Sequence, residues 1–427
     1  MGVRRAGPVR VALLSVHTSP LDQPGTGDAG GLNVYVVQTA RRLAEAGVAV
    51  EIFTRRTGSD SPHHVALAPG VTVTHLTAGP FDGLRKEDLP AQLCALTAGL
   101  MRVEAARPEG WFSLVHSHYW LSGQIGWVAS ERWNIPLVHS MHTMAAVKNS
   151  ALAAGDTPEP PVRLIGEQQV VAAAERLIAN TEDEATSLRE WYGAPAHRID
   201  VVHPGVDLGM FAPVDEGARG AIRARLGFRP SDHVLAFIGR VQPLKAPDLL
   251  LHAAAAIRDA NPAVADRLRI VICGGLSGTG LADPDHLPGL AAAHGIAERV
   301  DFLDPLPQPQ LADLMRAADL VVVPSHSESF GLVAIEAQAC GTPVIATRVG
   351  GLVTAVADGV SGVLVDGHDP RHWAERLSDL LTDPTLLAHL RTGARNHAEN
   401  FGWEATTAGL LGSYDRALAR RARGSAA

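Results

Sequence analysis

Residues 325–341 read SHSESFGLVAIEAQACG, and this stretch decides the fold. The apolar run before it, Leu320–Pro324, is a candidate strand of the kind that is buried on both faces of a parallel sheet. The alanine-rich run Leu332–Cys340 after it is a candidate helix, and the residues between the two are loop-like. A strand, a loop and a helix in succession form the repeating unit of an α/β fold.

Two carboxylates belong to this unit. Glu328 is predicted in the loop and Glu336 on the helix, so that both can reach toward one bound molecule. Carboxylates accept hydrogen bonds from paired hydroxyls such as those of ribose or a hexose, and the amides of residues 329–331 can bind an anion at the helix start. The alternative is that Glu328 only complements the helix dipole and that Glu336 is a solvated helix residue.

The same alternation of strand and helix extends over the whole chain and restarts after Pro204-Gly205. It predicts two Rossmann-like, doubly wound domains over residues 1–205 and 206–403, with a basic helix over 404–427 that packs back on the first. Ligands of such sheets lie beyond the carboxyl ends of the strands, so the predicted site is a cleft between the domains. The candidate strands are Val9–Ser15, Val48–Thr54, Val71–Thr77, Ser113–Ser117, Pro136–Ser140, Arg176–Asn180 and Ile199–His203, and then Val234–Arg240, Leu268–Gly274, Arg299–Leu303, Leu320–Pro324, Pro343–Ala346 and Val363–Val365.

Composition excludes several classes of protein. A chain of 427 residues with 46% apolar residues has room for two domains with their own cores. The net charge of −8 lacks the positive field of a nucleic-acid binder, so any phosphate must be held by a local arrangement. No apolar stretch approaches the roughly 20 residues that span a bilayer. The three cysteines, far apart in the sequence, fit a reducing compartment, and we expect a cytoplasmic protein.

A second segment, FIGRVQPLK at residues 237–245, places Arg240 and Lys245 in the loop after a candidate strand. An arginine that binds bidentately and a mobile lysine charge form a natural clamp for a diphosphate leaving group. In isolation the pair could equally be surface charge. A third segment, HTSPLDQPGTGDAGGLN at residues 17–33, is glycine-rich and lets backbone amides approach a ligand, although its spacing is not the dinucleotide fingerprint.

Taken together, the carboxylate pair and the strand GTPVIATRVGG that follows it resemble the retaining glycosyltransferases of family four, which have the GT-B fold. The resemblance implies that Glu336 holds the donor ribose and that Glu328 lies beside the transferred sugar. It also implies that Arg240 and Lys245 bind the donor pyrophosphate. A uracil contact near Leu306 is implied as well, through a backbone atom, because the side chain there varies in the family.

The first half of the chain narrows the resemblance further. HTSPLDQPGTGDAGGLNVYV, AGPFDGLRKEDLP, HSHYWLSGQIGW and HTMAAVKNS are similar to the D-inositol-3-phosphate glycosyltransferases of mycothiol synthesis, and the likeness runs from about residue 9 to about residue 417. Two cations and two hydroxyl groups form a chemically sensible phosphate cage. The resemblance implies that Lys86, Tyr119, Thr143 and Arg163 hold the inositol phosphate; that His17, Asp28, Ala29, Gly30, Gly31, Leu32 and Asn33 hold the inositol ring; that Gln23, Pro24 and Gly31 contact the donor; and that His142 lies beside the transferred sugar.

The resemblance also implies a homodimer and a structural magnesium ion. The ion would be held by backbone carbonyls of Met315, Arg316 and Ala318 together with Thr342, and carbonyl ligation tolerates Met315 in place of an aromatic residue. Three other histidines of the first half, His116, His118 and His139, are interpreted as packing or scaffold residues at strand ends.

The implied reaction transfers N-acetylglucosamine from UDP-N-acetylglucosamine to 1D-myo-inositol 3-phosphate with retention. No carboxylate is placed to act as a nucleophile, which favours attack on the same face as the leaving group. Three alternatives stay open: another family-four transferase such as a sucrose-phosphate-synthase-like enzyme, an isomerase such as a UDP-N-acetylglucosamine 2-epimerase, and a catalytically silent nucleotide-sugar binding protein.

Overall fold

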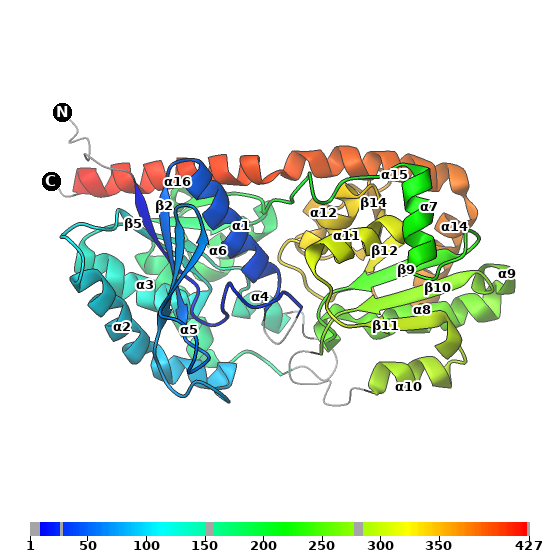
Figure 1. Ribbon diagram of the computed structural model, residues 1–427, viewed down its shortest axis with the longest axis horizontal. Helices are drawn as coiled ribbons and strands as arrows, with labels where there is room; N and C mark the ends of the chain where they lie inside the picture. Colours follow the sequence, from blue (N-terminus) through cyan, green and yellow to red (C-terminus); the bar gives the residue numbers. More distant parts are fainter. Residues whose placement is uncertain (1–8, 26–28, 151, 153–156, 277–284, 425–427) are drawn as a thin grey trace.

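The computed structural model describes residues 9–25, 29–150, 152, 157–276 and 285–424, which form two lobes side by side (Figure 1). The first lobe contains an eight-stranded sheet in the order β3-β4-β2-β1-β5-β6-β7-β8, and the second a six-stranded sheet in the order β11-β10-β9-β12-β13-β14. The strands of the first sheet are β1 Arg10–Leu14, β2 Ala49–Arg55, β3 His64–Ala68, β4 Val71–Leu76, β5 Leu114–His118, β6 Leu137–Ser140, β7 Arg176–Ala179 and β8 Ile199–Val201; those of the second are β9 His233–Ile238, β10 Leu268–Cys273, β11 Val300–Leu303, β12 Leu320–Val323, β13 Val344–Thr347 and β14 Gly362–Val365.

Helices cover both faces of each sheet (Figure 1), so the prediction of two doubly wound α/β domains is confirmed. Both sheets are parallel except at one edge, where β3 pairs antiparallel with β4. The sequence pattern missed β3 because it is a short edge strand in which no residue is fully buried. The helices of the first lobe are α1 Gly31–Glu45, α2 Leu93–Ala105, α3 Trp120–Trp133, α4 Ala145–Ser150, α5 Pro161–Ala173 and α6 Glu182–Tyr192; those of the second are α7 Glu216–Arg225, α8 Pro247–Ala260, α9 Pro262–Ala265, α10 His286–Ala293, α11 Gln308–Ala317, α12 Leu332–Ala339, α13 Leu352–Ala355, α14 Pro370–Thr382 and α15 Pro384–Ala398.

The unit at residues 320–339 has the predicted form. All four residues of β12 are buried, and α12 begins directly after Gly331. Gly331 has a φ of 98°, and a Cβ atom there would lie 2.7 Å from Leu352 Cδ2, so only glycine suits this turn. The turn directs the loop that carries Glu328 toward the carboxyl edge of the sheet.

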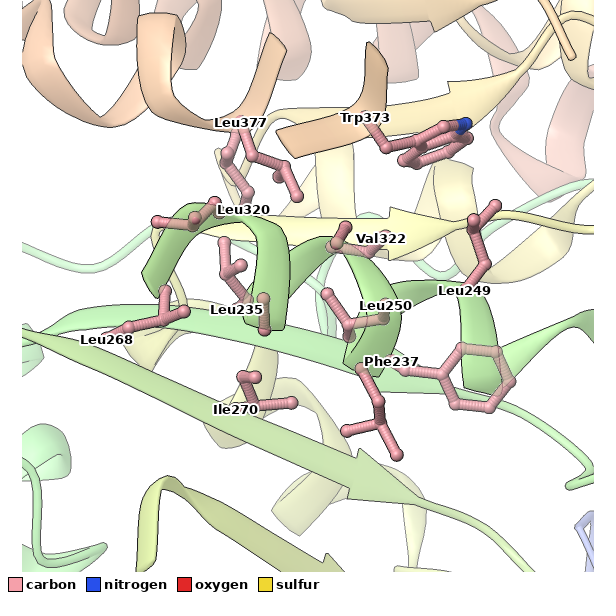
Figure 2. Packing of buried hydrophobic residues seen from close by; sticks show 14 of the residues in the cluster. Leu235, Phe237, Leu249, Leu250, Leu268, Ile270, Leu320, Val322, Trp373 and Leu377 are labelled. Atoms are coloured by element: carbon pink, nitrogen blue, oxygen red, sulfur yellow. The ribbon is translucent and has the colours of Figure 1, made fainter. Parts of the chain in front are cut away.

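Apolar side chains from both faces of the strands make the cores. In the second lobe, Leu235, Ile270 and Leu320 of the sheet pack against Leu250 of α8 and Trp373 of α14 (Figure 2). Burying such a side chain contributes about 1.5–3 kcal/mol to folding, so the sheet is a rigid platform for the loops at its edge.

The last helix, α16 (Trp403–Gly424), extends back along the first lobe (Figure 1). The hydroxyl of Tyr414 lies 2.7 Å from Nδ1 of His116, and Ser413 Oγ donates to Asp200 Oδ2 over 2.7 Å. The helix therefore packs on the first sheet and links the two lobes. Within the described residues, none of the helices is long and apolar enough to span a bilayer.

Candidate active site

Loops that follow strand ends of one sheet contact loops that follow strand ends of the other. After β1, Gln23 Nε2 donates to Pro305 O over 3.1 Å, and Gly25 O accepts from Gly275 N over 3.2 Å. After β6, the carbonyl of His142 accepts a hydrogen bond from the hydroxyl of Ser329. The carboxyl edges of the two sheets therefore face each other, as expected for ligands of doubly wound sheets.

Arg240 and Lys245 lie on the second lobe's side of this interface. Arg240 follows β9, and Lys245 ends the short 3₁₀ helix η3 (Pro243–Lys245). The Lys245 ammonium forms an ion pair with the carboxylate of Glu328, which joins the two segments that sequence analysis singled out separately. A Cβ atom on Gly30 would lie 3.7 Å from Arg240 Nε, so the glycine-rich loop of the first lobe lies against this cation.

Glu336 lies in α12, and only 7% of the residue is exposed. Within the described part of the chain its carboxylate has no hydrogen bond or ion pair, and burial alone raises its pKa to about 8. The reading of Glu336 as a solvated helix residue is therefore wrong. A buried carboxylate without a partner is suited to accept hydrogen bonds from ligand hydroxyls, because these would supply the stabilisation that the protein lacks.

The four predicted cage residues lie together in the first lobe. Arg163 Nη2 donates to Thr143 Oγ1 over 2.8 Å, and the Arg163 guanidinium lies 5.0 Å from the centre of the Tyr119 ring. The Lys86 ammonium lies 5.3 Å from the same ring. The structure thus brings two cations and two hydroxyl groups to one place, although they are up to 77 positions apart in the sequence (163 − 86).

The cage also contains charges that sequence analysis missed. Arg163 Nη1 lies 2.8 Å from Glu159 Oε1 and Arg163 Nε lies 2.7 Å from Glu167 Oε1, while Lys148 forms an ion pair with Glu159. Burial by itself would raise the pKa of Glu159, but Arg163 and Lys148 outweigh it and lower that pKa to about 2. The chain has only three lysines, Lys86, Lys148 and Lys245, and all of them lie at the predicted site. Because lysine is so rare in this sequence, its position alone could have marked Lys148 as a candidate site residue.

The loop predicted to hold the inositol ring is partly outside the described residues, since Asp28 lies there. His17 is half-buried, and its ring centre lies 4.3 Å from that of Tyr119, beside the cage. Asn33 is buried, and its side chain donates to Thr18 Oγ1 over 2.9 Å and accepts from Gly30 N over 3.0 Å. The Asn33 amide therefore shapes the loop. Of the other predicted residues here, Ala29 is buried, Gly30 and Leu32 are half-buried, and Gly31 is exposed.

The predicted donor contacts lie where the lobes meet. Gln23 is exposed and Pro24 half-buried on the first lobe, and Leu306 is half-buried on the second. A Cβ atom on Gly31 would lie 3.2 Å from Leu332 Cδ1, at the start of α12. The start of α1 therefore approaches the start of α12, and both helix N-termini lie near the segment that carries Glu328.

Two residues at the site have a backbone conformation that is unfavourable for side chains. Tyr119 has a φ of 71° and His142 a φ of 61°. Such strain persists only where the surrounding structure imposes it, and it gathers at functional sites. His142 Nε2 also lies 2.8 Å from His118 Nδ1, so the side chain of His142 is held as well as its backbone.

The oxygens predicted to hold magnesium already have partners. Thr342 Oγ1 donates to Met315 O over 2.7 Å, and Arg219 donates to Arg316 O over 3.0 Å and to Ala318 O over 3.2 Å. These oxygens are neutral, and a guanidinium group already binds two of them, so the arrangement does not fit a magnesium ion. No group of three or more histidine, cysteine, aspartate or glutamate side chains in the described ranges could hold a metal ion.

Comparisons with known proteins identify both lobes as glycosyltransferase domains. The family model described as "Glycosyl transferase 4-like domain" matches residues 30–205, and the model described as "Glycosyl transferases group 1" matches residues 218–397. Among solved structures, sucrose-phosphate synthase from Thermosynechococcus elongatus has a TM-score of 0.87 at 30% identity, covering 96% of this chain and 100% of that one. Anabaena Alr3699/HepE, solved in complex with UDP and glucose, has a TM-score of 0.76 at 21% identity, covering 95% and 99%, which is a likeness of fold.

Relatives along the whole chain narrow the assignment. The D-inositol 3-phosphate glycosyltransferase of Salinispora arenicola (strain CNS-205) is 60% identical over 415 residues, which cover 96% of this chain and 93% of that relative. The D-inositol 3-phosphate glycosyltransferase of Thermobispora bispora is 59% identical over 420 residues, which cover 98% of this chain and 97% of that relative. With this identity over nearly its whole length, and with the GT-B architecture, the chain belongs to the D-inositol 3-phosphate glycosyltransferase family.

Proposed function

We propose that the protein transfers N-acetylglucosamine from UDP-N-acetylglucosamine to 1D-myo-inositol 3-phosphate with retention, as the first step of mycothiol synthesis. The observation that carries the proposal is the pairing of two cationic sites across the lobes. Arg240 and Lys245 lie on one side, where a diphosphate would be bound, and Lys86 and Arg163 lie on the other, where a second phosphate would be bound. A donor diphosphate and a phosphorylated acceptor require these two sites together.

The donor would bind along the edge of the second sheet. Glu336 would accept hydrogen bonds from the two ribose hydroxyls, and Arg240 with Lys245 would bind the diphosphate. A Cβ atom on Gly274 would lie 1.8 Å from Gly239 O, so glycine keeps the strand ends β9 and β10 close together beside this position. Glu328, which pairs with Lys245, would contact hydroxyls of the transferred sugar.

In the proposed step an acceptor hydroxyl oxygen attacks the anomeric carbon on the face from which UDP departs. The bond from the anomeric carbon to the β-phosphate oxygen breaks, and the acceptor's proton passes to that leaving oxygen. Negative charge develops on the diphosphate, where Arg240 and Lys245 stabilise it. The bond to the new oxygen forms on the original face, so the configuration is retained without a carboxylate nucleophile.

A second candidate is the synthesis of sucrose phosphate, because the sucrose-phosphate synthase structure is 30% identical over 96% of this chain. That reaction would also use a phosphorylated acceptor. An epimerase, in contrast, would change the donor sugar without any acceptor.

Mass analysis of the products separates these functions. The protein is incubated with UDP-N-acetylglucosamine alone, or with inositol 3-phosphate, free inositol or fructose 6-phosphate. We expect UDP release and a glycosylated product with inositol 3-phosphate and none with free inositol, because the cage would bind the acceptor's phosphate. The relatives of 59–60% identity along the whole chain favour inositol 3-phosphate over fructose 6-phosphate. A product with fructose 6-phosphate would favour the second candidate, and an altered sugar without acceptor would favour the epimerase. The same incubation with EDTA tests the magnesium prediction, and we expect turnover to persist because Arg219 binds the carbonyls at Arg316 and Ala318.

We also propose a cytoplasmic homodimer. The free thiols of Cys94, Cys273 and Cys340 fit a reducing compartment. Val162 and Ile165 of α5, with 53% and 55% of their surface exposed, offer an apolar face for a second copy. Sedimentation measurements test the dimer.

Donor binding is expected to release protons because of Glu336. Its pKa of about 8 keeps the unliganded carboxyl group mostly protonated at pH 7, whereas ribose hydroxyls that donate to it favour the ionised form. We therefore expect up to about one proton released per UDP bound at pH 7, and an affinity that rises with pH until about pH 8. Calorimetric titration in buffers of different ionisation enthalpy measures the release. Glu336→Gln, which cannot ionise, is the control for protons released by UDP itself, and equal release from both proteins would contradict the role of Glu336.

A further inference from the structure

The geometry points to His118 as the positioning residue that fixes the ring orientation and the tautomer of His142, so that His142 presents Nδ1–H to the ligands between the lobes. The tautomer follows from the contacts of the two rings, whereas its use in turnover rests on the proposed function.

His118 ends β5 and is completely buried. Its Nδ1 lies 2.8 Å from His142 Nε2, a hydrogen-bond distance. Tyr35 of α1 packs edge-on against both rings, with ring centres 5.7 Å from His118 and 5.1 Å from His142. This packing leaves the rings little freedom to rotate, so the interpretation of His118 as a packing residue alone is incomplete.

Both rings are neutral at physiological pH. Burial lowers the pKa of His142 to about 3, and burial together with neighbouring histidines, His116 first among them, lowers that of His118 well below its usual value. A neutral imidazole carries one N–H group and one nitrogen that accepts. The bond between the rings therefore has two arrangements, and each assigns a tautomer to both residues.

The environment of His118 decides between the two arrangements. Its Nε2 is buried and has no hydrogen-bond partner among the described residues. If His142 donated to His118, this Nε2 would carry a buried N–H without an acceptor, and orphaned N–H groups are rarer in proteins than unfilled acceptors. His118 therefore donates its Nδ1–H to His142 Nε2.

The remaining proton of His142 then lies on Nδ1. His142 is half-buried in the loop two residues after β6, and its carbonyl accepts a hydrogen bond from Ser329 of the other lobe. With Nε2 engaged by His118, the ring has no free lone pair, so it is a hydrogen-bond donor to an oxygen of the sugar or the diphosphate and not a general base. This agrees with a step in which the leaving phosphate takes the acceptor's proton.

Nitrogen NMR of ¹⁵N-histidine-labelled protein without substrates reads the tautomer directly. The signals of His142 are identified by their loss in His142→Asn. We expect a protonated Nδ1 and a pyridine-like Nε2. A protonated Nε2 on His142 would overturn the assignment.

Variants of His118 test its role. The amide nitrogen of His118→Asn is attached at the same position as Nδ1 and can still donate, so we expect the His142 tautomer to persist, with kcat within about threefold of the original. His118→Leu removes the donor, and we expect mixed tautomers and a kcat lowered about 10- to 100-fold with a smaller change in acceptor KM. If His118→Leu does not fold, His118→Gln is used instead. The side-chain amide of glutamine lies one carbon farther from the backbone than the Nδ1 position, so we expect the same mixed tautomers and lowered kcat as for His118→Leu.

His139→Asn is the matched control, because His139 is equally buried at a strand end but bonds Ser117 Oγ over 2.8 Å. It is expected to leave the His142 signals unchanged. Unchanged signals and kcat in His118→Leu would overturn the proposal. Because the NMR measurement needs no substrate, an assay without inositol product would contradict the proposed function and leave the tautomer assignment intact.

Discussion

Replacing Lys245 by alanine is expected to lower kcat by about 100- to 1000-fold, while the KM for the acceptor changes by less than about threefold. The reason is that the lysine charge stabilises the diphosphate most when negative charge develops on it during bond breaking. The acceptor cage is on the other lobe and does not include this ammonium group. Steady-state kinetics with inositol 3-phosphate as the varied substrate measures both constants.

The matched control is Arg258→Ala, which removes a cation of the same lobe from an exposed pair with Asp259. It is expected to keep kcat near its original value. Because the side chains of Lys245 and Glu328 are only 19% exposed, urea unfolding of Lys245→Ala is measured as well, to separate a loss of stability from the loss of kcat. Normal turnover in Lys245→Ala would show that the diphosphate is stabilised by other groups.

Arg163→Ala is expected to destabilise the first lobe and to abolish saturation by the acceptor. Glu167 is completely buried beneath Arg163, and removal of one partner of a buried ion pair costs about 3–5 kcal/mol. The same substitution removes the guanidinium that would bind the acceptor phosphate. Urea unfolding measures the first effect, and initial rates at increasing inositol 3-phosphate measure the second.

A pair of neighbouring variants separates phosphate binding from stability. Lys86 is half-buried over the Tyr119 ring, whereas the side chain of Arg85 is 74% exposed and pairs with Asp88. Lys86→Ala is expected to raise the acceptor KM by about 10-fold or more with little loss of stability, because a charge-assisted hydrogen bond contributes about 1.5–3 kcal/mol. Arg85→Ala should change neither. An equal rise of the acceptor KM in Lys86→Ala and Arg85→Ala would mean that only the net positive charge of this region matters, and not a direct contact between Lys86 and the acceptor phosphate.

Much of the architecture could be predicted because it depends on local patterns. Each candidate strand overlaps a strand of the structure, and the candidate helix Leu332–Cys340 overlaps α12 Leu332–Ala339. Strands buried on both faces are continuous apolar runs, and the loops between them carry their own glycine and proline signals. The edge strand β3 lacks such a run, and it was missed for that reason.

The site could be predicted only where its residues form a local motif or match a family pattern. Arg240 and Lys245 are close in sequence, and so are Glu328 and Glu336, but nothing in either motif indicates the ion pair between Lys245 and Glu328. Glu159 and Glu167 belong to no sequence motif, and only the folded structure shows that Arg163 forms an ion pair with each of them.

The sequence by itself determined the two doubly wound lobes, the carboxylate pair at residues 325–341 and the nature of the charged groups at each strand end. Only the tertiary structure decided which groups meet: Lys245 with Glu328, Arg219 with the carbonyls predicted for a metal, and His118 with His142. The physical reason is that strand periodicity and turn chemistry act between neighbours along the chain. Burial, pKa shifts and tautomers depend on atoms that folding brings together from distant segments.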